Sequence, residues 1–282
     1  MLEVEARPLS DPDGVWVEPL SRARTGVLVL AGSSGSVDER RATWMAEHGT
    51  AAASIRWFGG TGQPPGICEV ALETFTPLVD ALAADFDRIA VVGTSKGGEA
   101  ALLLAAGDSR IDAVIAFAAP HVVWANVGPG LDGEARPARS SWTRAGVPLT
   151  FVPYDDGWSW TGDGPPALIG LYERSLETNP DIADAAAIPV EQITGEVVVV
   201  AGGDDQVWNS VRYAAEIERR RRAHGLATTV VSHPAAGHRT LLPGEPAPDG
   251  GMSMARGGSP AADAALGERA WPAIRSALRL GT

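Results

Sequence analysis

The chain has 282 residues, 45% of them hydrophobic, which is enough to build one large α/β domain with a sizeable core. Its net charge of −12 disfavours nucleic acid or an anionic membrane as a general partner, because either surface would repel it within a Debye length. The single cysteine, Cys68, excludes an internal disulfide and any CxxC metal or redox site. We therefore expect one domain over residues 1–282, no bound metal, and a small molecule as its partner.

The same composition predicts a cytoplasmic protein. There is no run of about 18 apolar residues, and "MLEVEARPLSDPDG" is acidic and polar where a secretory signal would be basic and then apolar. The most basic stretch, "ERRRRAHG" at 218–225, ends a helical pattern, where cations suit the negative end of the helix dipole. We interpret it as a solvated helix terminus.

Short apolar runs alternate with helical patterns along the chain, which is typical of a parallel sheet with crossover helices. Strands are predicted at 25–32, 51–57, 88–93, 112–119, 195–203 and 227–234. Helices are predicted at 38–48, 69–84, 98–107, 211–224 and 262–279. Runs such as "VVVVAGG" are continuously apolar, as strands buried on both faces must be.

The regular alternation stops at about residues 120–190, which are rich in proline, glycine and tryptophan. A long irregular insertion in a compact domain is usually functional, so we expect a lid or cap here. Four tryptophans lie in it: Trp124, Trp142, Trp158 and Trp160. Two interpretations are open, namely anchoring the insertion on the core or lining an apolar substrate pocket. Residues 241–264 are expected to form a surface loop.

The stretch "AVVGTSKGGEAALLLA" at 90–105 places a serine between glycines where a strand passes directly into a helix. Such a sharp turn exposes the hydroxyl of Ser95 above the sheet, and Gly93 and Gly97 keep the turn free of side chains. The alternative is that Ser95 only caps the helix. The position of this GxSxG between a buried strand and a helix favours a nucleophile.

A serine nucleophile needs a base and a group that orients the base, and in an α/β-hydrolase fold both follow later strands. His238 follows the strand run "TTVVSHP" in a loop at the carboxyl edge of the sheet, whereas His233 lies at the strand end itself. The acid is Asp204 or Asp205, which come directly after "VVVVAGG". His238 is therefore the predicted base.

The oxyanion of an acyl-transfer intermediate needs two backbone donors. The N–H of Lys96, at the start of the helix after Ser95, is one. The second should come from the loop "AGSSGSVDERR" after the first core strand, through Ser33 or Ser34. The alternative for that loop is an ordinary tight turn that caps the next helix.

Four segments, "GTSKGGEAAL", "IPVEQITGEVVVVAGGDDQVWNS", "HPAAGH" and "ERAWPAIRSAL", resemble the catalytic domain of the acyl-CoA thioesterase and bile acid-CoA:amino acid N-acyltransferase family of α/β-hydrolases. The resemblance runs from about residue 25 to the C-terminus. In the similar "D-Q-V" turns of hydrolases the aspartate before that pair orients the base, which favours Asp205 over Asp204.

Two departures from the family matter. Animal members carry an N-terminal β-sandwich domain, which we expect to be missing because only 24 residues precede the first core strand. The acyltransferase branch uses a cysteine nucleophile, whereas position 95 is serine, as in the branch that transfers the acyl group to water.

The resemblance thus implies a serine hydrolase, independent of any cofactor, that acts on an acyl thioester through Ser95, His238 and Asp205. A carboxylester hydrolase of the dienelactone-hydrolase type and a biosynthetic acyltransferase or cyclase are the alternatives. An acidic chain repels a phosphorylated substrate unless the pocket entrance is locally basic. The candidates for such a rim are Arg40, Arg41, Arg56, Arg136, Arg139 and Arg144.

Overall fold

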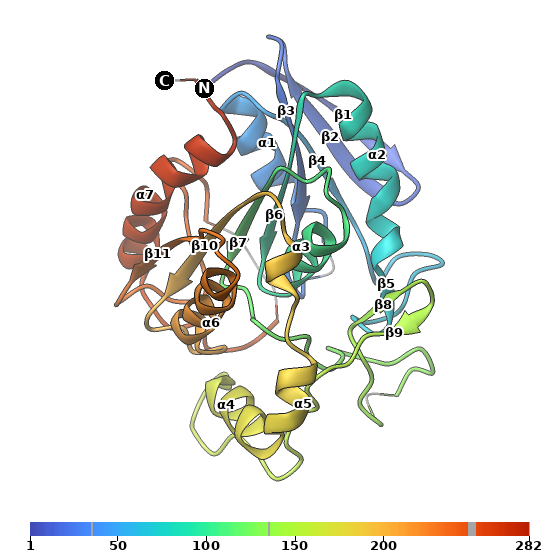
Figure 1. Cartoon of the computed structure of the whole chain (residues 1–282), viewed down its shortest axis with the longest axis vertical. Coiled ribbons are helices and arrows are strands. Elements are labelled where there is room, and N and C mark those ends of the chain that lie inside the picture. Colours follow the sequence, from blue (N-terminus) through green and yellow to red (C-terminus); the bar gives the residue numbers. More distant parts are fainter. Residues whose placement is uncertain (35, 135, 248–251, 282) are drawn as a thin grey trace.

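The central sheet of the protein has eight strands in the order β1-β2-β4-β3-β6-β7-β10-β11 (Figure 1). The computed structural model describes residues 1–34, 36–134, 136–247 and 252–281. β1 pairs antiparallel with β2 and β2 with β4, and the other neighbours are parallel. The strands are β1 (Val4–Ser10), β2 (Asp13–Pro19), β3 (Thr25–Leu30), β4 (Ala51–Ile55), β6 (Arg88–Thr94), β7 (Ala113–Phe117), β10 (Glu196–Gly202) and β11 (Thr229–His233). The predicted mostly parallel sheet with flanking helices is confirmed.

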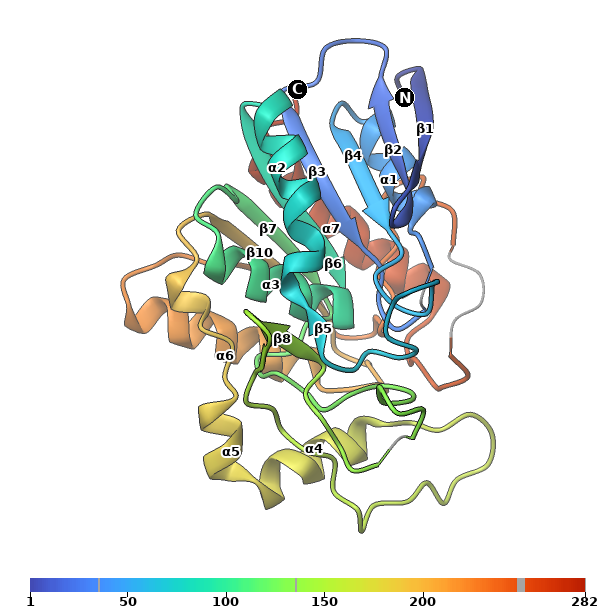
Figure 2. The ribbon, with the colours of Figure 1, turned by 90° about the vertical axis from the view of Figure 1, so that its right-hand side faces the viewer.

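Helices cover both faces of this sheet (Figure 2). One face packs against α2 (Thr76–Asp85), α3 (Lys96–Gly107) and α6 (Ser210–Ala223), and the other against α1 (Glu39–Glu47) and α7 (Pro260–Ala277). Alternate residues of one strand supply the two cores. In β3, Leu28 belongs to the core under α3, whereas Val27 and Val29 belong to the core under α1 and α7. The strands in the middle of the sheet are therefore apolar on both faces.

The predicted cap leaves the sheet after β7 and returns at β10. It contains α4 (Ile169–Thr178), α5 (Pro180–Ala185), the 3-10 helix η2 (Val190–Gln192) and the short strands β8 (Trp142–Arg144) and β9 (Val147–Pro148). β8 pairs with β5 (Val70–Ala71), which joins the cap to the body of the protein. Figures 1 and 2 both place α4 and α5 beyond one end of the sheet.

Two of the cap tryptophans act as anchors. Trp124 and Trp142 are completely buried. Trp158 is partly exposed, Trp160 is 40% exposed, and none of the four is among the residues that line the pocket described below. The anchoring interpretation therefore holds for Trp124 and Trp142.

Three predictions of elements were wrong or incomplete. The N-terminal hairpin of β1 and β2 was not predicted, and neither were the helices of the cap. The helix predicted over 69–84 begins only at Thr76, because Val70 and Ala71 pair with β8 and residues 72–75 form the 3-10 helix η1 (Leu72–Phe75). Pro77 then lies in the first turn of α2, where its missing N–H costs nothing.

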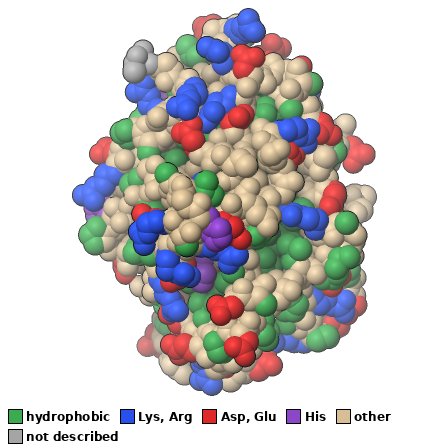
Figure 3. Space-filling view, in the orientation of Figure 1, with side chains coloured by type: hydrophobic (Ala, Val, Ile, Leu, Met, Phe, Trp, Pro, Cys, Tyr) green, Lys and Arg blue, Asp and Glu red, His purple; other side chains and the backbone are tan. Residues whose placement is uncertain are grey.

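The surface is mixed in charge. In Figure 3 basic and acidic side chains alternate over most of the visible face, and acidic ones gather at the end formed by α4 and α5. Part of the predicted loop at 241–264, residues 248–251, lies outside the described residues; the described part of 241–259 has no helix or strand, and α7 begins at Pro260.

Candidate active site

Ser95 lies on a strained turn between β6 and α3. Its φ of 57° and ψ of −121° are a conformation that residues other than glycine rarely adopt. A Cβ on Gly93 would lie 2.1 Å from the carbonyl oxygen of Gly97, and one on Gly97 would lie 2.4 Å from the carbonyl oxygen of Leu30. Neither glycine tolerates a side chain, which is why both are required for so sharp a turn.

The alternative role of Ser95 as a helix cap is not what the structure shows. Within the described chain its side chain makes no capping hydrogen bond to the first turn of α3. Its backbone instead fixes the turn, because the Ser95 N–H donates to the carbonyl of Phe117 at 2.9 Å and the Ser95 carbonyl accepts from the N–H of Glu99 at 3.0 Å. Ser95 is among the residues that line the pocket.

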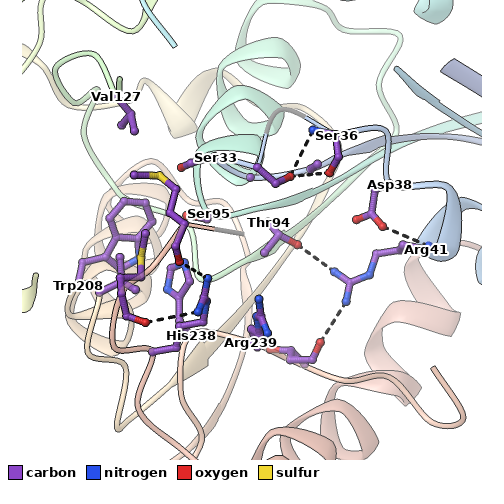
Figure 4. Close-up of a pocket in the computed structure, with 18 of the residues that line it drawn as sticks. Ser33, Ser36, Asp38, Arg41, Thr94, Ser95, Val127, Trp208, His238 and Arg239 are labelled. Atoms are coloured by element: carbon purple, nitrogen blue, oxygen red, sulfur yellow. Dashed lines mark hydrogen bonds between the residues drawn. The ribbon is translucent and has the colours of Figure 1, made fainter. Parts of the chain in front are cut away.

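His238 and Asp205 form a buried hydrogen-bonded pair. Nδ1 of His238 lies 2.8 Å from Oδ2 of Asp205, and the two side chains are 8% and 1% exposed. An ionised carboxylate can only accept, so Nδ1 carries the proton and Nε2 is left as an acceptor. His238 and Ser95 line the same cavity (Figure 4).

The carboxylate of Asp205 is held from four directions. Oδ1 accepts from the backbone N–H groups of Val207 at 2.8 Å and Trp208 at 3.3 Å, and Oδ2 also accepts from the hydroxyl of Ser210. These bonds fix the plane of the carboxylate, and with it the orientation of the imidazole.

Asp204, the other candidate, has a different set of partners. Its side chain is exposed, and it accepts from the N–H of Gly258 at 2.8 Å and from the amide of Gln206 at 3.0 Å. It thus ties the turn after β10 to the segment before α7. In the structure Asp205 contacts His238, whereas Asp204 joins the turn after β10 to the segment before α7.

Two side chains near the pair had not been singled out from the sequence. Trp208 packs edge to face against His238 with ring centroids 5.4 Å apart, and its indole N–H donates to the carbonyl of Ala118 at 3.0 Å. Ser210 begins α6 and reaches back to Asp205. In the sequence, the motif "DDQVWNS" contains both Trp208 and Ser210 but does not indicate which residues they contact.

The two proposed oxyanion donors come from segments that meet at Ser95. Lys96 begins α3 directly after it, and Ser33 and Ser34 line the pocket beside it. A Cβ on Gly32 would lie 3.2 Å from the Cβ of Ser95, so the 33–34 loop lies against the turn that carries Ser95. The hydroxyl of Ser34 bonds that of Ser36 at 2.7 Å.

The side chain of Lys96 points into the protein. Its ammonium group donates to Oε2 of Glu99 at 2.6 Å, and both side chains are almost completely buried. Burial lowers the pKa of Lys96 and raises the pKa of Glu99, while their mutual attraction opposes both shifts. Oε1 of Glu99 accepts from the N–H of Trp124 at 3.1 Å and from the indole N–H of Trp142 at 2.8 Å. The ion pair therefore joins α3 to the cap.

A cavity of about 210 Å³ surrounds Ser95 and His238. One wall is apolar and comes largely from the cap and the turn after β10: Val127, Leu168, Tyr172, Val207, Trp208 and Met254. The lining is also charged: it includes Arg40, Arg41, Arg239 and Arg256 together with the acidic residues Asp38 and Glu245. Apolar side chains and an excess of basic over acidic ones thus share the cavity with the serine.

The predicted basic rim is only partly at the pocket. Arg40 and Arg41 line it, whereas Arg56, Arg136, Arg139 and Arg144 are not among its lining residues in the described chain. Of those, Arg136 pairs with Asp156 and Arg139 with Asp132, and Arg144 donates to the carbonyl of Leu103. Arg239 and Arg256, near His238 and before α7, had not been predicted.

The described residues contain no group of three or more His, Cys, Asp or Glu side chains that could hold a metal ion. None of their helices combines the length and the apolar character that crossing a membrane requires.

Residues 78–279 match the family model described as BAAT / Acyl-CoA thioester hydrolase C terminal. The chain belongs to this family. The matched span contains Ser95, Asp205 and His238, and it includes the cap.

Among curated proteins, this chain is 28% identical over 262 residues to acyl-coenzyme A thioesterase 2, mitochondrial, of Mus musculus. The matched region covers 89% of this chain and 54% of the relative. It is 26% identical over 265 residues to acyl-coenzyme A amino acid N-acyltransferase 2 of Mus musculus, covering 90% of this chain and 59% of the relative. The chain thus spans little more than half the length of these relatives.

Solved structures share the fold at lower identity. A protein of Klebsiella pneumoniae assigned as a dienelactone hydrolase superposes with a TM-score of 0.53 at 13% identity, over 99% of this chain and 100% of that one. A dienelactone hydrolase-like promiscuous phosphotriesterase from metagenomic libraries gives 0.50 at 17% identity, over 98% of each chain. The chain therefore has the α/β-hydrolase fold.

Proposed function

We propose that the protein is a serine hydrolase that cleaves an acyl thioester through an acyl-enzyme on Ser95. The observation that carries the proposal is the buried pair of His238 and Asp205 in one cavity with a serine on a strained strand-to-helix turn. Membership of a family described by acyl-CoA thioester hydrolysis supports the choice of substrate.

In the proposed first step, Nε2 of His238 takes the proton of the Ser95 hydroxyl as Oγ attacks the acyl carbonyl carbon. Asp205 keeps Nδ1 protonated and stabilises the imidazolium. The carbonyl oxygen becomes an oxyanion that accepts from the N–H of Lys96 and from an N–H of the Ser33–Ser34 loop. Its collapse breaks the carbon–sulfur bond, and the imidazolium gives its proton to the departing sulfur, which leaves His238 neutral for the next step.

In the second step a water molecule gives its proton to His238 and attacks the acyl-serine. A second tetrahedral intermediate forms in the same oxyanion site, and its collapse releases the carboxylic acid while the proton returns to Ser95. Every proton taken by His238 is thus given back within one turnover.

A thioester suits this site for a chemical reason. A thiol has a pKa of about 8.5, so a thiolate leaves with little proton donation from His238, less than an alkoxide needs. The apolar side chains that line the cavity are suited to an acyl chain, and the arginines that also line it are suited to an anionic leaving group.

Serine at position 95 favours hydrolysis over the N-acyltransfer that names one of the relatives. The cysteine of this chain, Cys68, is buried outside the cavity, and burial raises the pKa of its thiol, so it is not a substitute nucleophile. Water is then the simplest acceptor for the acyl group.

The test is turnover of a matched pair of substrates, a medium-chain acyl-CoA and the p-nitrophenyl ester of the same acid. We expect wild type to prefer the thioester and Ser95→Ala to lose at least about 1000-fold in kcat. Labelling of Ser95 by a fluorophosphonate, followed by peptide mass spectrometry, identifies the nucleophile independently of the substrate.

The outcomes separate the parts of the proposal. Turnover of the ester alone contradicts the thioester assignment and supports the carboxylesterase alternative. Labelling of Ser95 without turnover of either substrate indicates another acyl group or acceptor. A Ser95→Ala variant as active as wild type contradicts the nucleophile itself.

A further inference from the structure

Arg41 is a buried arginine at the first turn of α1, a helix to which the proposed reaction assigns no role. Its side chain is 9% exposed and extends to the cavity wall (Figure 4). In the sequence it is the second arginine of "DERRAT", at the start of a helix, where arginines are usually exposed. Its burial therefore calls for an explanation.

Its guanidinium group is held by four hydrogen bonds to three residues in two segments. Nε and one terminal nitrogen donate to the two carboxylate oxygens of Glu245 at 2.7 and 2.9 Å. The same terminal nitrogen donates to the carbonyl of Thr240 at 3.0 Å, and the other donates to the hydroxyl of Thr94 at 2.9 Å. This is the planar fork that only arginine provides.

Those segments are the ones that carry the nucleophile and the base. Thr94 immediately precedes Ser95, and Thr240 lies two residues after His238. The guanidinium also lies over the ring of Phe117 at 4.7 Å, and the carbonyl of Phe117 accepts from the Ser95 N–H. One side chain thus contacts the end of β6, the end of β7 and the histidine loop.

The charge of Arg41 is compensated within this cluster. Burial alone would lower the pKa of the guanidinium, but the adjacent carboxylate of Glu245 outweighs that effect and raises the pKa. Glu245 in turn accepts from the N–H of Leu242 at 3.0 Å, which closes the loop beyond His238. The charge and the donors of Arg41 are thus committed to protein groups. Its place in the cavity wall is explained by holding segments together, not by binding an anion.

We propose that Arg41 is a positioning residue that fixes the strand end of Ser95 and the loop of His238 relative to each other. The inference rests on the proposed function, because it concerns the alignment of the hydroxyl with the imidazole. A displacement of about 1 Å between such groups can cost on the order of 100-fold in rate. Arg41 acts on catalysis only through the segments it holds.

The test compares Arg41→Met/Glu245→Gln, which leaves no charge uncompensated, with Arg221→Met. Arg221 is a matched control, since it is also a buried arginine, and it donates to the carbonyls of Val190, Ile193 and Ala227 away from the cavity. Both variants should unfold at lower temperature. We expect kcat and the rate of fluorophosphonate labelling of Ser95 to fall about 100-fold in the first variant, with KM within about threefold, and both rates to stay at the wild-type level in the control.

Two further variants keep the test decisive if the double variant folds poorly. Thr94→Val removes only the hydroxyl that accepts from Arg41 and should lower the labelling rate about tenfold. In Arg41→Ala, free guanidinium at millimolar concentration can enter from the cavity and should restore labelling at least fivefold, whereas urea and sodium chloride at the same concentration should not.

If wild type labels at Ser95, and if kcat and the labelling rate are unchanged in the Arg41 and Thr94 variants, the proposal is overturned. A loss that only follows the unfolded fraction, as in Arg221→Met, overturns it as well. If wild type labels at Ser95 but turns over no thioester, the substrate assignment fails while the role of Arg41 is still measured by labelling. If wild type does not label at all, the nucleophile and the role of Arg41 fall together.

Discussion

Asp204 and Asp205 are adjacent in the chain, but their carboxylates face different partners. Both lie in the turn after β10, and the Asp205 side chain reaches the buried His238 while the Asp204 side chain reaches the exposed segment before α7. The pair provides a matched comparison within one turn.

We expect Asp205→Asn to lower kcat by about 10⁴-fold, because an asparagine at this position can favour the wrong tautomer of His238. Asp204→Asn keeps an acceptor for the Gly258 N–H and should change kcat by less than about threefold. Steady-state kinetics of both variants on one substrate checks this. Equal losses in the two variants would mean that the hydrogen bond to His238 does not matter for the reaction.

At the level of residues, the sequence identified the candidates that a local pattern determines. Ser95 is fixed by glycines two positions away on either side, and His238 by its place after a strand. Arg41 and Ser210 could not be predicted in this way, because their partners lie at Thr94, Thr240 and Asp205, far from them in the chain or across a turn. Only the folded structure brings those groups together.

At the level of elements, α3 is joined to the cap by a buried ion pair. Glu99 accepts from Lys96 and from two tryptophans of the cap, so removing its carboxylate leaves an ammonium and two N–H donors without their acceptor. The exposed pair of Arg219 and Glu216 on α6 has the same i,i+3 spacing and provides a control.

We expect Glu99→Ala to lower the free energy of unfolding by about 3–5 kcal/mol, and Glu216→Ala by no more than about 1 kcal/mol. Lys96→Met/Glu99→Gln should recover much of the loss, since the double change leaves no buried charge. Urea unfolding followed by circular dichroism measures all three. A Glu99→Ala variant as stable as Glu216→Ala would contradict the importance of this link.

An element could be predicted from the sequence when its own residues carry the signal, without reference to the strand with which it pairs. Five of the six predicted strands, namely β3, β4, β6, β7 and β10, are buried along most of their length, so their apolar runs identify them without knowledge of neighbours, whereas the edge strand β11 is mostly exposed. β1 has mainly exposed side chains and depends on pairing with β2, so its composition carries no such signal, although "SDPDG" between the two is typical of a turn. β5, β8 and β9 are two or three residues long and exist only through their pairing.

At the scale of the whole molecule, charge is unevenly distributed. The net charge is −12 and acidic groups gather over α4 and α5 (Figure 3), yet four arginines line the cavity. Arg40 donates to the carbonyl of Ala247 and Arg256 to that of Met252, and neutral carbonyls do not cancel their charge. The cavity can thus attract an anion in a chain that repels it elsewhere.

We expect Arg40→Gln/Arg256→Gln to raise KM for an acyl-CoA about tenfold and to leave KM for the neutral N-acetylcysteamine thioester of the same acid within about twofold. Arg24→Gln/Arg110→Gln changes the net charge equally away from the cavity and serves as the control. Kinetics with both thioesters at low and at physiological salt measures the effect. An equal rise for both thioesters would point to altered cavity shape, not to charge.

The backbone conformation of Ser95 has a consequence for how such a protein can evolve. A non-glycine residue at φ 57° costs on the order of 1–3 kcal/mol, a sizeable fraction of the roughly 5–15 kcal/mol that holds a typical domain together. Glycine at this position would relieve most of that cost and remove the hydroxyl at the same time. Selection of this chain for heat resistance alone would therefore favour sequences without the hydroxyl that the proposed mechanism requires, and any library screened for thermal robustness has to be screened for turnover as well.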